Sequence, residues 1–408
     1  MNILLLGNGF DLYHSLPTKY INFLSVVSFL ANNTAIKADT IGDVFGNFEL
    51  QRLDNGIKES YEKYKSTYDK VKIEPSVIQK LILLGNTNMW FRYLLQSFNK
   101  DIGWIDFEKE IAIVVKSFEE LLREEGVKIL PKKRLSSAIT RYLTYYFGFY
   151  LTPSKEHNYS NLPWMVNNDF SVEYPLGSTN RIINQEKVIN TLVDALAELS
   201  DGLKLYLQCF VDNAVREINA DKQIELCKAC LHTNYTITFN YTNTYETLYS
   251  QGQTFHLHGN VNDRIVLGIN PDSADDIETV DTTFIAFKKY YQRTMYETDS
   301  QYLQWLNDRY DHQEDLNLLI MGHSLDITDR DILYELIELA SDIKILYYGE
   351  KSKEQYIANL VRIFGREGFM TLRTQKNLTF LSLDADFTEF AEERAQLKDL
   401  ESFVESYL

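Results

Sequence analysis

The feature that most constrains the fold is a short apolar run that leads directly into a glycine turn. The segment MNILLLGNGFD contains the run Ile3-Leu4-Leu5-Leu6, followed at once by Gly7-Asn8-Gly9. A short apolar run bounded by glycine predicts a buried strand. Glycine lets a ligand approach the backbone, and the first N–H groups of a following helix point at anions such as phosphate. The third glycine of G-x-G-x-x-G is absent, because Leu12 stands there, so the motif predicts a nucleotide site only together with other strand ends.

Composition excludes several classes of protein. The net charge of -17 disfavours nucleic acid and anionic membrane surfaces as partners, because both are themselves negatively charged. No apolar run approaches the ~20 residues that a membrane-spanning helix needs, and the N-terminus lacks a basic signal-peptide region. Three cysteines cannot frame a disulfide-stapled fold. We therefore expect a cytoplasmic protein that does not enter a membrane.

The predicted secondary-structure pattern changes near residue 231. Before it, helical patterns predominate, for example over 107–122 and 190–231, with a loop expected over 152–180. After it, strands alternate with helices, two of which we expect to begin near Thr328, with Asp329 and Asp331 in the first turn, and at a capping box over 352–355. The expected strands are 235–239, 254–257, 265–269, 316–321, 345–348 and 378–383.

Alternating strands and helices predict an α/β fold with a parallel sheet. We expect a Rossmann-like, mostly parallel sheet formed by residues 1–20 and 231–385. Residues 21–230 would form a large helical insertion, and residues 386–408 a C-terminal helix.

Four predicted strand ends break into short polar loops. In an open parallel sheet, a ligand binds beyond the carboxyl ends of the strands, where the strand order reverses. We therefore expect four loops to converge on one crevice: Gly7-Asn8-Gly9-Phe10-Asp11, Phe239-Asn240-Tyr241-Thr242, His256-Leu257-His258-Gly259-Asn260 and Gly322-His323-Ser324-Leu325-Asp326.

Polar side chains in these loops have both a functional and a structural interpretation. His256 and His258 lie two residues apart, so on a strand both would face one side, with His258 as a general base or both as half-exposed residues. Asn240 can hold water or a ribose hydroxyl, or end its strand in an Asx turn. Asp11 can bind a ribose hydroxyl or cap the following helix.

Two further groups of residues are candidate sites. Trp104-Ile105-Asp106-Phe107-Glu108 places two carboxylates beside aromatic rings, which suits either a crevice that raises their pKa or the acidic start of a helix. Histidines of the two strand ends with a carboxylate would suit a metal, but no H-E-x-x-H supports this. Cys227 and Cys230 form a lone C-x-x-C without a second pair, which indicates buried helix cysteines, and we expect no metal.

These motifs, in this order, resemble the bacterial abortive-infection AbiH family. The family's hallmarks are G-N-G-F-D after a strand, W-x-D-F-E in a helical region, F-N-Y-T, a following H-G and a late G-H-S-x-x-D. The resemblance covers nearly the whole chain and implies a role in defence against bacteriophage, with a phage-derived protein as the trigger. The matching residues are 7–11, 104–108, 239–242, 258–259 and 322–326.

The same order is similar, more distantly, to the sirtuin-like NAD-binding fold. There, a G-A-G-x-S loop, a strand-end Asn, a catalytic His in an H-G pair and a G-[TY]-S loop surround NAD. The chain has Asn8 in place of the alanine and Asp11 in place of the serine, and it lacks the four-cysteine zinc ribbon of the deacylating members. The resemblance therefore implies NAD hydrolysis rather than deacylation. The residues expected to contact NAD are Gly7, Asn8, Gly9, Phe10, Tyr241, Gly259, Gly322, His323, Ser324 and Asp326.

The sequence leads to the hypothesis of an NAD glycohydrolase with NAD as substrate. His258 would be the general base, Asn240 would position water, and Asp11 would steady a ribose hydroxyl or the developing cation. Gly7 and Gly9 would hold the pyrophosphate. Three alternatives stay open: a non-hydrolysing nucleotide-sensing or interaction module, a metal-dependent hydrolase or nuclease, and a toxin acting through protein contacts alone. The insertion is rich in Tyr and Phe, which makes a homo-oligomer a further expectation.

Overall fold

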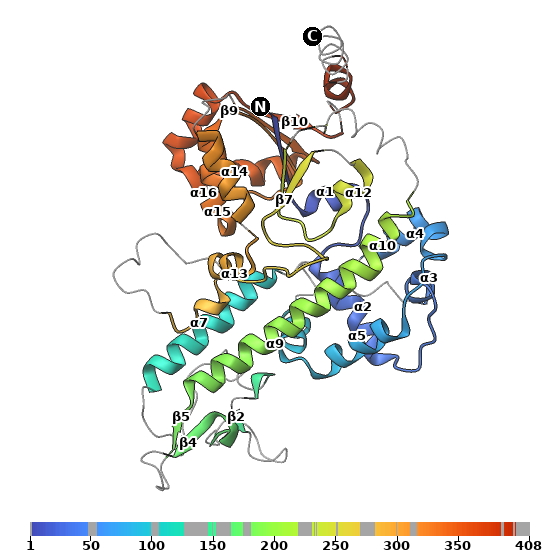
Figure 1. Ribbon diagram of the computed structural model, residues 1–408, viewed down its shortest axis with the longest axis vertical. Coiled ribbons are helices and arrows are strands. Elements are labelled where there is room, and N and C mark those ends of the chain that lie inside the picture. The colour runs from blue at the N-terminus through green and yellow to red at the C-terminus, as the bar shows by residue number, and fades with distance from the viewer. Residues whose placement is uncertain are drawn as a thin grey trace.

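The protein consists of a sheet with helices on both faces and a large helical part beyond the carboxyl ends of its strands (Figure 1). The structure is a computed structural model. It describes residues 2–47, 55–98, 106–125, 146–148, 150–151, 165–173, 181–218, 231, 233, 235–249, 252–269, 282–298, 300–310, 316–384, 387–394 and 396.

The central sheet has six parallel strands in the order β10-β9-β8-β1-β6-β7. Counted along the chain, this is the order 6-5-4-1-2-3 of a Rossmann fold, and the direction of winding reverses between β1 and β8. The predicted α/β, Rossmann-like parallel sheet with helical insertions is thus confirmed. The strands are β1 (Asn2–Leu6), β6 (Tyr235–Thr238), β7 (Gln253–His256), β8 (Leu316–Met321), β9 (Ala340–Tyr347) and β10 (Leu378–Ser382).

Both faces of the sheet are apolar, as expected for a parallel sheet covered by helices. Successive residues of a strand point to opposite faces. Ile3 and Leu5 accordingly belong to one hydrophobic cluster, while Leu4 and Leu6 belong to another. The first cluster includes side chains of α14 (Ser300–Tyr310), α15 (Arg330–Leu339) and α16 (Glu350–Gln375). The second includes α1 (Asn8–Tyr13), α12 (Thr244–Tyr249) and the helical residues 387–394.

The helices between β1 and β6 have a hydrophobic core of their own. The predicted helical pattern over 107–122 is confirmed by α7, and the pattern from residue 190 is helical as far as Val215. Within the described residues, no helix is apolar and long enough to cross a membrane. The helices are α2 (Tyr20–Asn32), α3 (Ile41–Gly46), α4 (Gly56–Tyr68), α5 (Pro75–Thr87), α6 (Met89–Ser97), α7 (Phe107–Glu125), α9 (Gln185–Tyr206), a π-helical turn (Leu207–Asp212) and α10 (Asn213–Val215).

Three expectations about secondary structure were wrong. Residues 265–269 form no strand, because the main chain of Leu267 bonds to the side chain of Gln292, and the segment packs on the helical core. No capping box begins at Ser352, whose hydroxyl donates back to the carbonyls of residues 348 and 349 inside a helix that starts at Glu350. The loop expected over 152–180 contains two short strands, β3 (Met165–Val166) and β4 (Ser171–Glu173). They pair with two strands that flank the segment, β3 with β2 (Tyr150–Leu151) and β4 with β5 (Arg181–Ile183).

Candidate functional site

The loops after β1, β6, β7 and β8 line one cavity of about 560 Å³. Its volume falls in the range of ~300–1,000 Å³ that is usual for small-molecule sites. The cavity lies at the carboxyl ends of the strands beside the reversal of winding, so the predicted convergence of the loops is confirmed. The predicted residues that line it are Gly7, Asn8, Gly9, Asp11, Asn240, Tyr241, His258, Gly322, His323, Ser324 and Asp326.

The glycines at the reversal are required because two backbones pack against each other. The N–H of Gly7 donates to Met321 O at 3.2 Å, and the N–H of Gly9 donates to Gly322 O at 2.8 Å. A Cβ on Gly9 would stand 2.7 Å from the Cα of Gly322, closer than real Cβ contacts come. Gly322 also has φ +73°, which favours glycine. These two N–H groups therefore bond to the neighbouring loop, and the glycines leave the cavity wall free of side chains there.

Two of the three residues predicted to be catalytic present a buried oxygen without a hydrogen-bond partner among the described residues. These atoms are Asp11 Oδ1 and Asn240 Oδ1, whereas His258 Nε2 faces the Asp329 carboxylate at 3.3 Å. The residues come from α1 and from the loops after β6 and β7, and all three line the cavity. Buried polar atoms in folded proteins are nearly always paired, so two unpaired oxygens in one cavity point to a ligand or water.

The surroundings of Asp11 favour its uncharged form. The residue is 1% exposed, and its Oδ2 accepts a hydrogen bond from Thr242 Oγ1 at 2.7 Å. Burial raises the pKa of Asp11 from 3.8 to about 7, although the hydroxyls of Thr242 and Thr244 oppose the rise. Asp212 and Glu246 raise this pKa further by their negative charges. The carboxyl group can therefore change its charge near neutral pH.

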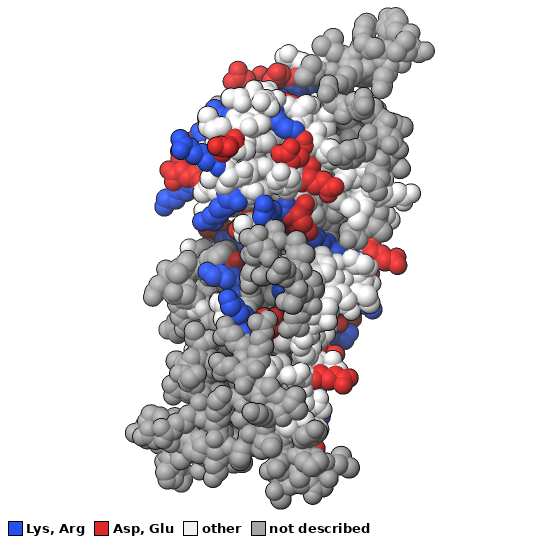
Figure 2. Space-filling model, turned by 90° about the vertical axis from the view of Figure 1, so that its left-hand side faces the viewer, with Lys and Arg blue, Asp and Glu red and all other residues white. Residues whose placement is uncertain are grey.

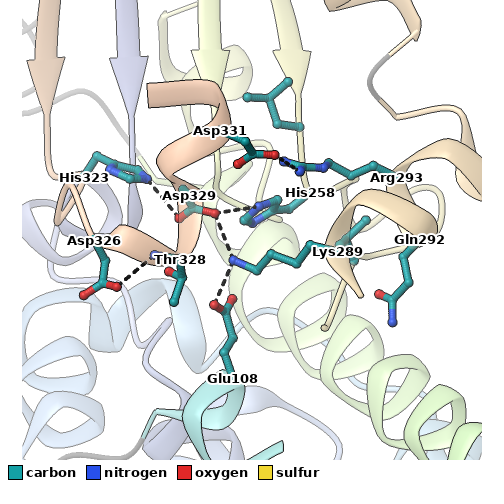
Figure 3. Close-up of polar contacts among 12 residues, drawn as sticks. Glu108, His258, Lys289, Gln292, Arg293, His323, Asp326, Thr328, Asp329 and Asp331 are labelled. Atoms are coloured by element: carbon teal, nitrogen blue, oxygen red, sulfur yellow. Dashed lines mark hydrogen bonds and ion pairs between the residues drawn. The ribbon is translucent and has the colours of Figure 1, made fainter. Parts of the chain in front are cut away.

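His258 lies in a buried network of charges (Figure 3). Its Nε2 is 3.3 Å from Asp329 Oδ1, and Lys289 Nζ donates to the same oxygen at 2.9 Å. Burial, and next the charge of Lys289, lower the pKa of His258 to about 4, although Asp329 opposes them. Burial raises the pKa of Asp329, but Lys289 and His258 outweigh it and hold that pKa well below its usual value. The ring of His258 is thus uncharged at neutral pH and lies beside a carboxylate.

His323 approaches Asp329 from the opposite side (Figure 3). The backbone N–H of Leu325 donates to His323 Nδ1 at 3.0 Å, so an uncharged ring carries its proton on Nε2. That atom is 3.6 Å from Asp329 Oδ2. Asp326 fixes the turn before Asp329 by accepting a hydrogen bond from the N–H of Thr328 at 3.1 Å. The loop after β8 therefore presents a single carboxylate to two imidazoles and one ammonium group.

The helical insertion forms the opposite wall of the cavity. Tyr20 stacks on Phe107, with ring centroids 4.1 Å apart, and its hydroxyl lies 3.4 Å from that of Tyr241. Glu108 Oε2 is 2.8 Å from Lys289 Nζ, and both Glu108 and Asp106 line the cavity. Burial raises the pKa of Glu108, and Lys289 opposes the rise. Asp106 precedes α7 and accepts a hydrogen bond from the N–H of Lys109, and Glu108 lies in the first turn, so both the helix-start and the cavity interpretations apply.

Three predicted residues lie outside the lining of the cavity. Phe10 is fully buried against Tyr245 and Tyr249 on the sheet face. Gly259 has φ +72° and faces the carbonyl of Arg264, so it is a turn glycine. β7 ends at His256, which pairs with Glu246 and Asn240 O instead of sharing a face with His258. Strand alternation does not extend past the last strand residue, so the expectation of a shared face was wrong. Trp104, Cys227 and Cys230 lie outside the described residues.

Sequence reasoning missed several residues of the site. Asp329 was expected only as an acid in the first turn of a helix, and Lys289 carried no signal because it lies in no motif. A carboxylate three residues after Asp326, in a loop already singled out, was the one available hint. The other lining residues missed are Thr18, Lys19, Tyr20, Ile21, Leu207, Thr328, Gln355 and Asn359.

The cavity is rich in carboxylates, whereas the visible surface is mixed in charge. On the face shown in Figure 2, Lys and Arg side chains are interspersed with Asp and Glu. Within the described residues, no group of three or more His, Cys, Asp or Glu side chains has the arrangement of a metal site. The acidic residues lining the cavity are Asp11, Asp106, Glu108, Asp326 and Asp329.

A comparison with known proteins identifies the family. The model of one family, described as bacteriophage abortive infection AbiH, matches residues 3–348. No curated protein matches the chain. The matched span includes all the loops that line the cavity, as well as α7 and Lys289. It covers well over half of the 408 residues. The chain therefore belongs to the bacteriophage abortive infection AbiH family.

Proposed function

We propose that this abortive-infection protein binds NAD in the cavity and hydrolyses its N-glycosidic bond to nicotinamide and ADP-ribose. The observation that carries the proposal is the convergence of two unpaired buried oxygens, Asp11 Oδ1 and Asn240 Oδ1, with the uncharged imidazole of His258 in one cavity. They lie beside the reversal of a Rossmann sheet, where dinucleotides bind.

The charge of the cavity suits the nicotinamide end of NAD. The nicotinamide ring of NAD carries a positive charge, and five acidic residues line the cavity, two of which also pair with the Lys289 ammonium group. Asp11 can respond to this charge, because a nearby cation favours its ionised form. In the cavity, the ionised Asp11 would then stabilise the positive charge that the ribose acquires when nicotinamide leaves.

The reaction needs one water molecule and one proton acceptor. The bond between ribose C1′ and the nicotinamide nitrogen breaks, and its electron pair neutralises the ring. Water adds to C1′ and gives up a proton, which the uncharged His258 accepts, while Asn240 Oδ1 orients the water through a hydrogen bond. Asp329 stabilises the charged imidazole that results.

The remainder of NAD would lie along the paired loops at the reversal. Gly7, Gly9 and Gly322 present backbone rather than side chains to the cavity, so a diphosphate can approach closely. Lys19 brings a positive charge to the same cavity, and Ser324 brings a hydroxyl. These two polar groups would contact the diphosphate in place of the Gly7 and Gly9 amides, which already donate to Met321 O and Gly322 O.

The test is NAD consumption by the purified full-length protein, alone and with extracts of phage-infected cells. Nicotinamide and ADP-ribose are quantified by chromatography. We expect His258→Ala and Asn240→Ala to lower turnover by about 100-fold or more, the usual contribution of acid–base and orienting groups. The matched control is Asn262→Ala, because Asn262 is exposed and lies outside the cavity lining.

The alternatives give different results in the same assay. Tight NAD or ADP-ribose binding without turnover under any trigger would identify a nucleotide sensor instead. Activity that EDTA abolishes would indicate a metal-dependent hydrolase. Normal turnover by His258→Ala would refute the proposed mechanism. An unimpaired antiphage phenotype of the double variant Asn240→Ala/His258→Ala would indicate a toxin that acts through protein contacts alone.

A further inference from the structure

Lys289 is a buried lysine that connects two parts of the fold. It belongs to α13 (Lys289–Tyr296) and is 0% exposed. Its Nζ lies 2.8 Å from Glu108 Oε2 on α7 of the insertion and 2.9 Å from Asp329 Oδ1 after β8. Figure 3 shows the ammonium group between the two carboxylates. The insertion and the Rossmann sheet thus meet at one cation.

Lys289 is placed to act through its neighbours rather than on a ligand. It is not among the described residues that line the cavity. Burial lowers the pKa of a lysine, but Asp329 and Glu108 outweigh this effect and raise the pKa of Lys289 above its usual value. The group therefore stays charged, and it pairs with two carboxylates that themselves line the cavity.

The neighbour that matters most is His258. Asp329 Oδ1 faces both Lys289 Nζ and His258 Nε2, so the lysine fixes the oxygen that the imidazole contacts. The charges of Lys289 and Arg293 oppose a positive charge on the ring, whereas Asp329 favours one. Arg293 in turn pairs with Asp331. The other groups facing this cluster are Glu108, His323 and Tyr241.

We propose that Lys289 is a positioning residue that holds the Asp329 carboxylate against His258, and that Glu108 ties this arrangement to helix α7 of the insertion. The role of His258 as a base rests on the proposed function, whereas the contacts among Lys289, Asp329 and Glu108 do not depend on it. It also explains two residues of the W-x-D-F-E motif, since Phe107 anchors α7 by stacking on Tyr20 and Glu108 supplies the counter-charge of the buried lysine. Displacement of α7 would then change the charge balance at the proposed base.

The test compares Lys289→Met with Glu108→Gln/Lys289→Met. The double variant removes the buried cation together with one buried carboxylate, so it stays informative if the single variant does not fold. Lys288→Met is the matched control, because Lys288 is the preceding residue and forms none of these ion pairs. The readout is the pH titration of the His258 ring by NMR of histidine labelled at Cε1, with His258→Gln used to assign the signal among seven histidines.

In the wild-type protein and in Lys288→Met, the His258 signal should stay that of an uncharged ring down to pH 5. In the double variant, loss of the nearby positive charge should move the titration upward by about 1 to 2 pH units. The acidic limb of kcat/KM for NAD should move by the same amount. An unshifted His258 titration in the folded double variant would overturn the inference. The two failures are distinguishable, because absence of NAD turnover with a shifted titration would refute the proposed function alone.

Discussion

Replacement of Asp11 by Asn is predicted to change the pH dependence of stability. Asp11 is 1% exposed, and its pKa rises from 3.8 to about 7, chiefly through burial. The folded protein therefore binds this proton more tightly than the unfolded chain does. Asn keeps the size of the side chain and an oxygen that can accept the bond from Thr242, but it never becomes charged.

The sign and size follow from linkage. Because the folded-state pKa is raised, Asp11 does not lower the unfolding free energy below pH 3.8, where it is protonated in both states. The unfolding free energy falls as the pH rises from 3.8 to about 7, and above that pH the full loss remains. The full pKa difference corresponds to about 4 kcal/mol. Most of this loss develops above pH 5, so the stability of the wild-type protein relative to Asp11→Asn should fall by about 2 to 3 kcal/mol between pH 5 and pH 8.

The assay is urea unfolding of both proteins at the two pH values. The new amide leaves one donor without a partner, which costs about 1–3 kcal/mol at either pH, so the change with pH is the informative quantity. Asp263→Asn is the control, because Asp263 is exposed. Parallel pH profiles of Asp11→Asn and wild type would refute the conclusion that burial controls the charge of Asp11. The variant should also lose NAD turnover, if the ionised carboxylate stabilises the developing cation.

Three further predictions concern the cavity. Gly322→Ala should lower the unfolding free energy by about 2 kcal/mol or more, because φ is +73° and a Cβ would collide with the Phe10 backbone; an unchanged urea midpoint would contradict this close packing. Lys289→Met should lower the unfolding free energy by about 3–5 kcal/mol, because it leaves two buried carboxylates without their cation. Adding Glu108→Gln should recover part of this free energy; equal stabilities of the single and double variants would show that an unpaired Glu108 does not destabilise the protein. NAD should bind more tightly as the pH rises through about 7, the pKa of Asp11, whereas ADP-ribose, which lacks the charged ring, should not; calorimetry would decide, and identical pH dependence for both ligands would argue against contact between Asp11 and nicotinamide.

The fold was largely predictable because its signals are local. Short strand-like runs in the sequence indicated all six strands of the sheet, including β10. The segment 265–269 failed, because β-branched and apolar residues look the same whether they pair with a strand or pack on helices. What decided its structure was the side chain of Gln292, distant in the sequence.

The site was predictable only where its residues belong to motifs. Asp11, Asn240 and His258 stand at strand ends, and a Rossmann sheet brings such ends together. Lys289 stands outside any motif, so its position between two carboxylates depends on how the insertion packs on the sheet. Phe10 lies inside a motif but points into the core, because it belongs to helix α1, where successive side chains point in different directions around the axis.

The most direct test of the NAD site is a crystal structure of the His258→Gln variant soaked with NAD. We predict density that extends from the paired loops at Gly9 and Gly322 to the group formed by Asp11 and Asn240, with the nicotinamide ribose at the latter. NAD bound elsewhere on the protein, or an empty cavity at a concentration that supports turnover by the wild-type protein, would contradict the proposed site.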